Sequence, residues 1–176
     1  EENYIKRIYH LQQETGLVNT NSLAAEMQTR AASVTDMLKK LKGKKLLQYE
    51  KYKGFKLNDA GKKAALDVVR KHRLWEYFLV EHLKFDWDKV HPIAEELEHI
   101  SSEELVQRLD NFLGNPLFDP HGDPIPDKNG KITVLKQQNL SEIPFKKNVT
   151  VSSVSNQTAQ MLDMLRHYHI SLGTQL

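Results

Sequence analysis

The 176-residue sequence contains no cysteine. Disulfide bridges and thiolate zinc sites are therefore excluded, and cysteine usage gives no indication of the cellular compartment. No run approaches the roughly 18 consecutive apolar residues that favour a transmembrane helix, so we expect nothing that spans a membrane. The chain begins with Glu-Glu-Asn rather than Met and has no signal-peptide pattern, from which we predict a trimmed start and a cytoplasmic location.

The residues that are present suit a globular protein. Hydrophobic residues make up 39% of the sequence, which is enough for a core. The length of the chain predicts one or two domains, with room for a small additional segment.

Charge is distributed unevenly, although the net charge is only +2. Residues 1–73 contain 16 Lys and Arg against 8 Asp and Glu, whereas residues 74–176 contain 9 against 15. A basic N-terminal part followed by an acidic remainder predicts a nucleic-acid-binding half and a cation-binding or regulatory half. The alternative is a lysine-rich surface that has no such role.

Apolar residues recur at helical spacing in the basic part, which predicts helices over residues 3–14, 23–27 and 31–41. The last two are short helices joined by a brief turn, which is the pattern of a helix-turn-helix. Small polar and basic residues on and just before the third helix can reach base edges and phosphates. The residues that we expect to contact DNA here are Thr29, Arg30, Ser33, Thr35, Asp36, Lys39 and Lys40.

Residues 46–50 and 54–58 alternate apolar and polar side chains on either side of a short turn, which predicts a β-hairpin. Lys51 and Lys53 lie at its tip. A hairpin directly after a helix-turn-helix is the wing of a winged helix. We expect both lysines to lie beside the DNA backbone, where they would add salt-dependent affinity.

The sequence His-Pro-Ile-Ala-Glu-Glu-Leu-Glu-His at residues 91–99 predicts a helix, because proline at its second position suits a first helical turn. In such a helix two imidazoles and two carboxylates fall on one face, namely His91, Glu95, Glu98 and His99. The opposite, inward face is expected to carry Ile93, Leu97 and Ile100. Converging imidazoles and carboxylates are costly unless a cation satisfies them, which predicts a metal site; a solvated surface is the alternative.

A second His/Glu pair supports the metal hypothesis. His72 and Glu76 are four residues apart on a separate predicted helix over residues 59–80, so they share a face. Paired histidine and carboxylate motifs on two helices are a recurrent way to build a metal site in a helical bundle.

These features resemble the diphtheria-toxin-repressor/MntR family of metal-dependent transcriptional regulators. The resemblance rests on the winged helix, on residues 3–9, 70–74 and 90–99, and on the Pro-His-Gly-Asp-Pro-Ile-Pro loop at residues 120–126. It covers essentially the whole chain.

The resemblance implies a mainly α fold with a small amount of β structure. Residues 1–66 would form a winged helix-turn-helix DNA-binding domain, and residues 67–130 a helical dimerisation and metal-binding domain. Residues 131–176 would be a linker and the start of an SH3-like (FeoA-like) domain, of which only the opening half is present in this chain.

The resemblance also implies two metal sites. An activating site would use Asn3, Glu95, Glu98 and His99. A second site would use His72, Glu76 and His91, with the loop residues Asp119 and His121 as further candidates. Glu95 stands where iron-type relatives carry Cys, and its hard oxygen favours Mn²⁺ while tolerating Fe²⁺; Zn²⁺ is a further ion that could bind in vitro.

Two positions depart from the pattern of the family. Asn3 offers only a neutral amide oxygen, and Lys6 occupies a position that is a ligating Glu in MntR. We therefore expect two separated sites rather than a close pair of ions.

Local patterns predict the remaining elements. A capping pattern at residues 101–104 precedes a predicted helix over residues 105–113. Strands are predicted within residues 132–135 and 149–154, followed by a helix over residues 158–167.

The function that the resemblance implies is that of a metal-dependent repressor. It would sense Mn²⁺ or Fe²⁺, bind a palindromic operator in double-stranded DNA as a homodimer, and control metal-uptake genes. We expect no enzyme activity, because no nucleophile or separate general base stands beside the His/Glu cluster. The alternative is a winged-helix regulator that responds to a non-metal ligand.

Overall fold

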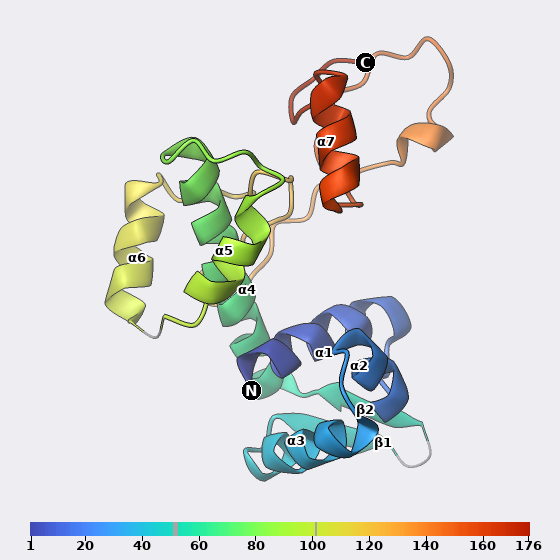
Figure 1. Cartoon of the computed structure of the whole chain (residues 1–176), viewed down its shortest axis with the longest axis vertical. Coiled ribbons are helices and arrows are strands. Elements are labelled where there is room, and N and C mark those ends of the chain that lie inside the picture. Colours follow the sequence, from blue (N-terminus) through green and yellow to red (C-terminus); the bar gives the residue numbers. More distant parts are fainter. Residues whose placement is uncertain (51–52, 101) are drawn as a thin grey trace. The chain divides into compact units, whose positions relative to one another are not determined.

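The computed structural model describes residues 1–50, 53–100 and 102–176. Its elements are, in chain order, α1 (Glu2–Thr15), α2 (Thr20–Glu26), α3 (Ala31–Gly43), β1 (Leu47–Glu50), β2 (Gly54–Leu57), α4 (Asp59–Glu81), α5 (Val90–Leu97), α6 (Glu103–Phe112), the 3-10 helix η1 (Leu140–Glu142) and α7 (Ala159–His167) (Figure 1). The predicted fold, mainly helical with one small sheet, is confirmed. The chain forms two compact units, Glu1–Val69 and Arg70–Leu176. Among the residues described, none of the helices combines the length and apolar character that a bilayer crossing requires.

In the first unit, α2 and α3 form the predicted helix-turn-helix. Asn19 caps α2, because its side-chain oxygen accepts a hydrogen bond from the Ser22 backbone N–H at 2.8 Å. On α3, Val34, Leu38 and Leu41 are buried at the spacing of an amphipathic helix. The opposite side of α3 is therefore left exposed.

The hairpin follows α3 directly. Its strands pair antiparallel, with Leu47 opposite Leu57 and Tyr49 opposite Phe55. Phe55 also pairs with Val18, and each backbone N–H donates to the other residue's carbonyl at 2.9 Å. This extra bridge fastens the hairpin to the segment between α1 and α2.

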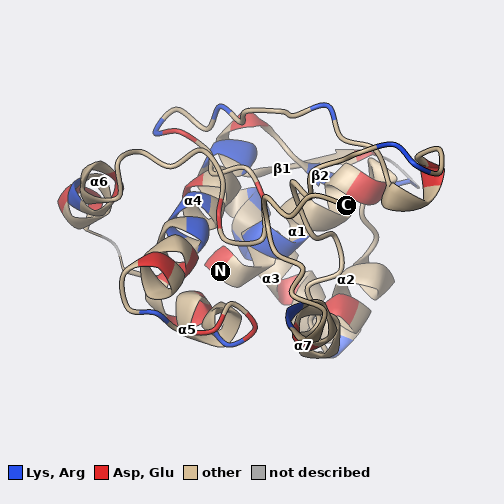
Figure 2. Ribbon diagram, turned by 90° about the horizontal axis from the view of Figure 1, so that it is seen from above, with Lys and Arg blue, Asp and Glu red and all other residues tan. Residues whose placement is uncertain are grey.

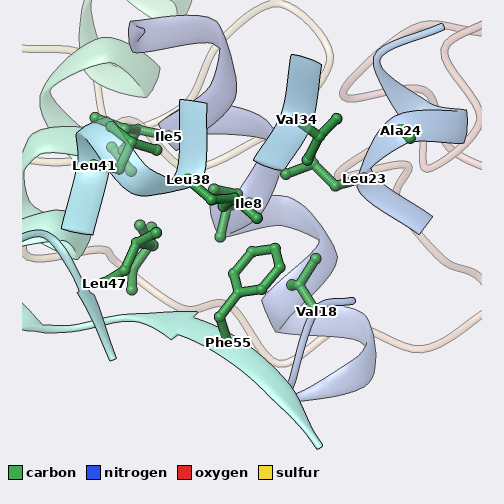
Figure 3. Close-up of a cluster of buried hydrophobic side chains, with 12 residues drawn as sticks. Ile5, Ile8, Val18, Leu23, Ala24, Val34, Leu38, Leu41, Leu47 and Phe55 are labelled. Carbon is green, nitrogen blue, oxygen red and sulfur yellow. The ribbon is translucent and has the colours of Figure 1, made fainter. Parts of the chain in front are cut away.

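The core of the first unit gathers between α1, α3 and the hairpin (Figure 3). The Phe55 ring points toward Ile8 and Val18, and all three side chains are at most 2% exposed. Gln12 adds a polar link, because its Oε1 accepts a hydrogen bond from the Leu57 backbone N–H at 2.8 Å. Packing on the inner face of α3 thus fixes the helix whose outer face is the candidate DNA-contacting surface.

The second unit has its own small core, built by α4, α6 and the loop that follows α6. Leu74 packs there with Leu109 and Ile125. Beside it, the buried Arg70 guanidinium contacts the Asp110 carboxylate at 2.8 Å. These contacts hold α4 against the loop that carries two of the predicted metal ligands.

α5 differs from the prediction in its end and in its buried face. The helix ends at Leu97, so His99 lies beyond it. Val90, Ala94 and Glu98 are buried, whereas the residues predicted to face inward are only partly buried, namely Ile93, Leu97 and Ile100. The predicted apolar inner face is therefore wrong. The buried face includes the Glu98 carboxylate, because a hydrogen-bonding partner is present inside for it.

The two predicted helices of the C-terminal half are confirmed, and both begin at a capping side chain. Ser102 Oγ accepts a hydrogen bond from the Leu105 N–H at the start of α6, and Thr158 Oγ1 accepts one from the Met161 N–H at the start of α7.

The strands predicted at 132–135 and 149–154 are wrong, since no regular strand forms in residues 131–176, all of which are described. Backbone hydrogen bonds join residues 149–151 to residues 173–176, but they form only a single bridge, between Thr150 and Gln175. Residues 132–135 have no pairing partner, and Val134 is 85% exposed. Alternation alone therefore did not produce a sheet here. The SH3-like domain stays a prediction.

Two helical glycines provide a test of the packing in the first unit. A Cβ atom on Gly61 of α4 would lie 2.2 Å from the Leu46 carbonyl oxygen, whereas nothing lies within 4 Å of the same position on Gly43 of α3. Gly61→Ala should lower the free energy of unfolding by about 1–3 kcal/mol, the usual range for overpacking. Gly43→Ala should leave it unchanged or raise it by up to about 1 kcal/mol. Chemical denaturation measures both, and equal stabilities would contradict the close approach of α4 to Leu46.

Candidate metal centre

Three predicted ligands meet between α4 and α5. His72 Nε2 lies 3.0 Å from Glu76 Oε1 and 3.1 Å from His91 Nδ1, and His91 Nδ1 lies 3.2 Å from the same Glu76 oxygen. One donor atom from each side chain falls within 4.8 Å of the others, which suits ligands around a single cation. We name this group the α4–α5 triad. His72 and Glu76 are buried, and His91 is exposed.

A second group shares Glu76 and adds Asp119 and His121 from the loop after α6. We name it the loop triad. Asp119 Oδ1 accepts hydrogen bonds from the backbone N–H groups of His121 and Asp123, at 2.8 and 3.0 Å. Gly122 between them has a φ of 87°, and a Cβ atom there would lie 2.1 Å from a backbone oxygen. The tight turn that presents His121 to Glu76 therefore requires glycine.

The hydrogen bonding of the His121 ring shows that Nε2 carries a proton. Nε2 lies 2.9 Å from the Trp87 carbonyl oxygen, and because a carbonyl only accepts, Nε2 is the donor. Nδ1 is buried, has no hydrogen-bond partner among the described residues, and lies 3.8 Å from Glu76 Oε2. An imidazole that donates one N–H to a carbonyl and turns its other nitrogen toward a carboxylate has the arrangement of a metal ligand. The residues present therefore fit a divalent cation.

Glu76 is ionised despite being buried. Its side chain is only 3% exposed, and burial by itself would raise its pKa. The imidazoles of His121, His72 and His91 outweigh that effect and hold the pKa of Glu76 far below its ordinary value. The site thus contains a buried carboxylate oxygen, a hard donor of the kind that Mn²⁺ prefers.

Asp119 is shifted in the opposite direction. Burial, together with the carboxylates of Glu76 and Asp123, raises the pKa of Asp119 to about 7. Arg73 opposes this rise, since its guanidinium lies 3.6 Å from both Asp119 and Asp123. A cation next to Asp119 would favour the ionised carboxylate, so metal binding there would be linked to proton release.

The other predicted ligands of the second unit lie close to the α4–α5 triad. Glu98 is completely buried, and its Oε2 lies 2.6 Å from His72 Nδ1. His99 Nε2 lies 3.9 Å from Glu98 Oε1. Glu95 is exposed, and its Oε1 lies 3.6 Å from His91 Nε2. These three residues do not form a further close group of three donors in the part of the chain that the structure describes.

Asn3 belongs to the first unit, where it is an exposed residue of α1. In the second unit, α5 carries Glu95 and Glu96 and no Lys or Arg (Figure 2). The surface beside the α4–α5 triad is therefore acidic along this helix, which favours the approach of a cation.

Three residues that shape the site were not predicted. Arg73 and Asp123 lie next to predicted ligands in the sequence, and only this proximity could have indicated that they belong to the site. Trp87 acts through its backbone carbonyl, and no side-chain pattern reveals such a role.

The predicted DNA-contacting residues that the structure describes lie just before α3, on its outer side and on the hairpin. Thr29 is partly buried, and the exposed members are Arg30, Ser33, Thr35, Asp36, Lys39, Lys40 and Lys53. Within α3, Thr35 Oγ1 donates to the Ala31 carbonyl at 2.9 Å, and Lys39 Nζ donates to Asp36 Oδ1 at 3.0 Å. Lys51 lies outside the described residues.

Two known domain families match the chain. Residues 1–55 match the iron-dependent repressor N-terminal DNA-binding domain, and residues 58–127 match the iron-dependent repressor metal-binding and dimerisation domain. The first match covers the helix-turn-helix and the start of the second hairpin strand, and the second covers both triads. The fold and the site thus define a winged-helix DNA-binding protein with a metal-binding domain.

Individual relatives agree with this class. The iron-dependent repressor IdeR of Mycobacterium tuberculosis is 32% identical over 125 residues, which cover 71% of this chain and 54% of IdeR. The transcriptional regulator MntR of Bacillus subtilis is 34% identical over 112 residues, which cover 64% of this chain and 78% of MntR. A solved structure of a manganese-dependent transcriptional repressor in complex with manganese has a TM-score of 0.87 and 36% identity, over 99% of this chain and 80% of that one.

The chain belongs to the iron-dependent repressor family, which includes the diphtheria toxin repressor and MntR, as the sequence predicted. It spans about half the length of the IdeR relatives that it matches, with 54% of each covered.

The raised pKa of Asp119 predicts a pH effect on the metal-free chain. A carboxyl that keeps its proton up to about pH 7 when folded, but only to about pH 4 when unfolded, stabilises the fold at low pH, and stability falls between those values. Asp119→Asn keeps an acceptor oxygen for the loop but cannot ionise. Its melting temperature in chelator should therefore rise relative to wild type as the pH goes from 4 to 7, and the difference should then level off.

A matched control is Asp127→Asn, because backbone hydrogen bonds from Lys131 and Asn129 lower the pKa of this exposed carboxylate. That variant should not gain stability at high pH. A difference between Asp119→Asn and wild type that does not vary with pH would contradict the raised pKa of Asp119.

Proposed function

We propose that this chain is a metal-dependent transcriptional repressor that senses Mn²⁺ or Fe²⁺. The observation that carries the proposal is the buried His121 Nδ1, which has no hydrogen-bond partner among the described residues and faces the ionised Glu76 carboxylate. Relatives named as iron-dependent or manganese-dependent repressors support the same function. They favour a metal over the non-metal ligand, and a regulator over an enzyme.

The proposed second site combines two carboxylates and three imidazoles, namely Glu76, Asp119, His72, His91 and His121. This mixture of oxygen and nitrogen donors suits Mn²⁺ and Fe²⁺, and we expect Zn²⁺ to bind in vitro as well. When bound, the ion supplies positive charge that neutralises the two carboxylates. Four residues stay the predicted ligands of a separate activating ion, namely Asn3, Glu95, Glu98 and His99.

The protein's own residues would then link ion binding to the position of the loop. Glu76 turns Oε1 toward His72 and His91 and Oε2 toward His121, so it stands between the two triads. Arg73 also contacts the loop, through Asp119. The positive charge of a bound ion would draw His121 on the loop and His91 on α5 toward Glu76.

For DNA binding we propose a homodimer that places α3 in successive major grooves of a palindromic operator, with Lys53 beside the backbone. Exposed apolar side chains on and after α6 supply candidate dimer contacts, namely Leu105, Phe112 and Leu117. We propose the domain limits 1–66, 67–130 and 131–176, an SH3-like start in the last of these, and action in the cytoplasm on metal-uptake genes.

Metal titration tests this function. Chelator-treated chain should bind a labelled metal-uptake promoter fragment weakly, and saturating Mn²⁺ should tighten binding by about 5–150-fold, the usual range of coupling between two ligands. Fluorescence anisotropy measures the affinity. Glu76→Gln should abolish the Mn²⁺ effect because it removes the buried charge shared by both triads. His167→Ala, which changes an exposed histidine on α7, should respond as wild type does. Equal binding with and without metal would contradict the proposal.

The role of α3 can be tested separately through salt dependence. Lys40 is exposed on α3, and Lys128 is an exposed lysine of the second unit. If Lys40 contacts a phosphate, Lys40→Ala should weaken Mn²⁺-dependent binding and reduce the slope of log affinity against log salt by about 1. Lys128→Ala should leave the slope as it is. An unchanged slope in Lys40→Ala would remove this residue from the proposed DNA interface.

A further inference from the structure

His72 has a carboxylate on each side of its ring. Nδ1 lies 2.6 Å from Glu98 Oε2, and Nε2 lies 3.0 Å from Glu76 Oε1. The side chains of His72, Glu76 and Glu98 are 10%, 3% and 1% exposed, so both contacts lie in the interior. Glu76 belongs to the α4–α5 triad, whereas Glu98 belongs to the residues predicted for the other ion. A single imidazole therefore joins the two sets of predicted ligands.

The chemistry of imidazole determines which ring nitrogen of His72 carries the proton when a cation is bound. A ring nitrogen that binds a cation must be unprotonated, so a cation on His72 Nε2 leaves the ring proton on Nδ1. That N–H then donates to Glu98 Oε2. Hydrogen bonds of this kind between a metal-bound histidine and a carboxylate orient the ring and increase its basicity.

The backbone holds Glu98 in place for this contact. It directly follows α5, and its N–H donates to the Ala94 carbonyl at 2.8 Å. With Oε2 held by His72, Glu98 Oε1 lies 3.9 Å from His99 Nε2. The same carboxylate thus contacts the α4–α5 triad through one oxygen and the neighbouring predicted ligand through the other.

We propose that Glu98 is a positioning residue for His72 in the α4–α5 triad, and that the His72–Glu98 hydrogen bond couples the two predicted ion positions. The inference rests on the proposed metal binding. A cation in the triad orients Glu98 for the second ion, and by linkage an ion held by Glu98 strengthens binding in the triad. Glu98 influences an ion that it does not touch.

The test works in a His99→Ala background, which removes one predicted ligand of the other position and keeps the His72–Glu98 pair. Zn²⁺ affinity is measured by competition with a chelating dye. Adding Glu98→Gln should weaken the triad's Zn²⁺ affinity about 10–100-fold, the usual effect of losing such a partner. The matched control adds Glu96→Gln instead, which makes the same charge change on the exposed side of α5 and should have little effect.

A spectroscopic measurement separates positioning from a general structural effect. In the Zn²⁺-loaded chain, ¹⁵N resonances should show His72 bound to metal at Nε2 and protonated at Nδ1, with a slowly exchanging proton. The Nδ1 resonance should move in Glu98→Gln and stay in place in Glu96→Gln. Because the unsubstituted chain already reports the tautomer, this part of the test stands even if Glu98→Gln fails to fold.

Two results would overturn the inference. One is an unchanged Zn²⁺ affinity and His72 Nδ1 resonance in Glu98→Gln; the other is a loaded chain in which His72 carries its proton on Nε2. Either result, obtained with Zn²⁺ still bound by the triad, would leave the proposed function intact. A wild-type chain whose triad residues bind no Zn²⁺ or Mn²⁺ would instead contradict the proposed function together with this inference.

Discussion

The second unit depends on the burial of one charged group, the Glu76 carboxylate. Removing a carboxylate from water costs several kcal/mol unless nearby groups compensate for it. Here the compensation comes from three imidazoles on three separate segments, His72 from α4, His91 from α5 and His121 from the loop. Each of those segments must therefore be positioned accurately for the unit to be stable, and the same positions give the donor arrangement that suits a divalent cation. Stability and metal binding thus rest on the same contacts.

The loop after α6 connects the Glu76 cluster to the C-terminal segment of the chain. His121 uses its side chain toward Glu76, while its backbone carbonyl accepts a hydrogen bond from the Val154 N–H at 2.9 Å. Gln157 Nε2 donates to Asp123 Oδ2 at 2.9 Å, so a second loop residue contacts the C-terminal segment. Ions that reposition the loop would therefore also act on residues 149–176, and the close approach at Gly122 leaves little room for independent movement.

Local patterns in the sequence were sufficient where short-range geometry decides the structure. The winged helix and the placement of His72 and Glu76 on one face of α4 follow from helical and strand periodicity. The burial of Glu98 could not be predicted from periodicity, because its partner His72 lies 26 residues earlier and only the tertiary fold brings them together. The strand expected at 132–135 failed for the converse reason, since an alternating pattern forms a strand only where another segment pairs with it. Residues 149–151 do pair with residues 173–176, but only through a single bridge, which is too short for a regular strand.

If Glu76 and its three imidazoles hold a cation, diffraction at the manganese absorption edge from crystals grown with Mn²⁺ will locate it most directly. We predict an anomalous peak next to the Glu76 carboxylate, within coordination distance of at least two of His72, His91, Asp119 and His121. A Mn²⁺-loaded crystal that lacks this peak, and in which His121 Nδ1 still has no ligand, would contradict the assignment of this buried cluster as the metal centre.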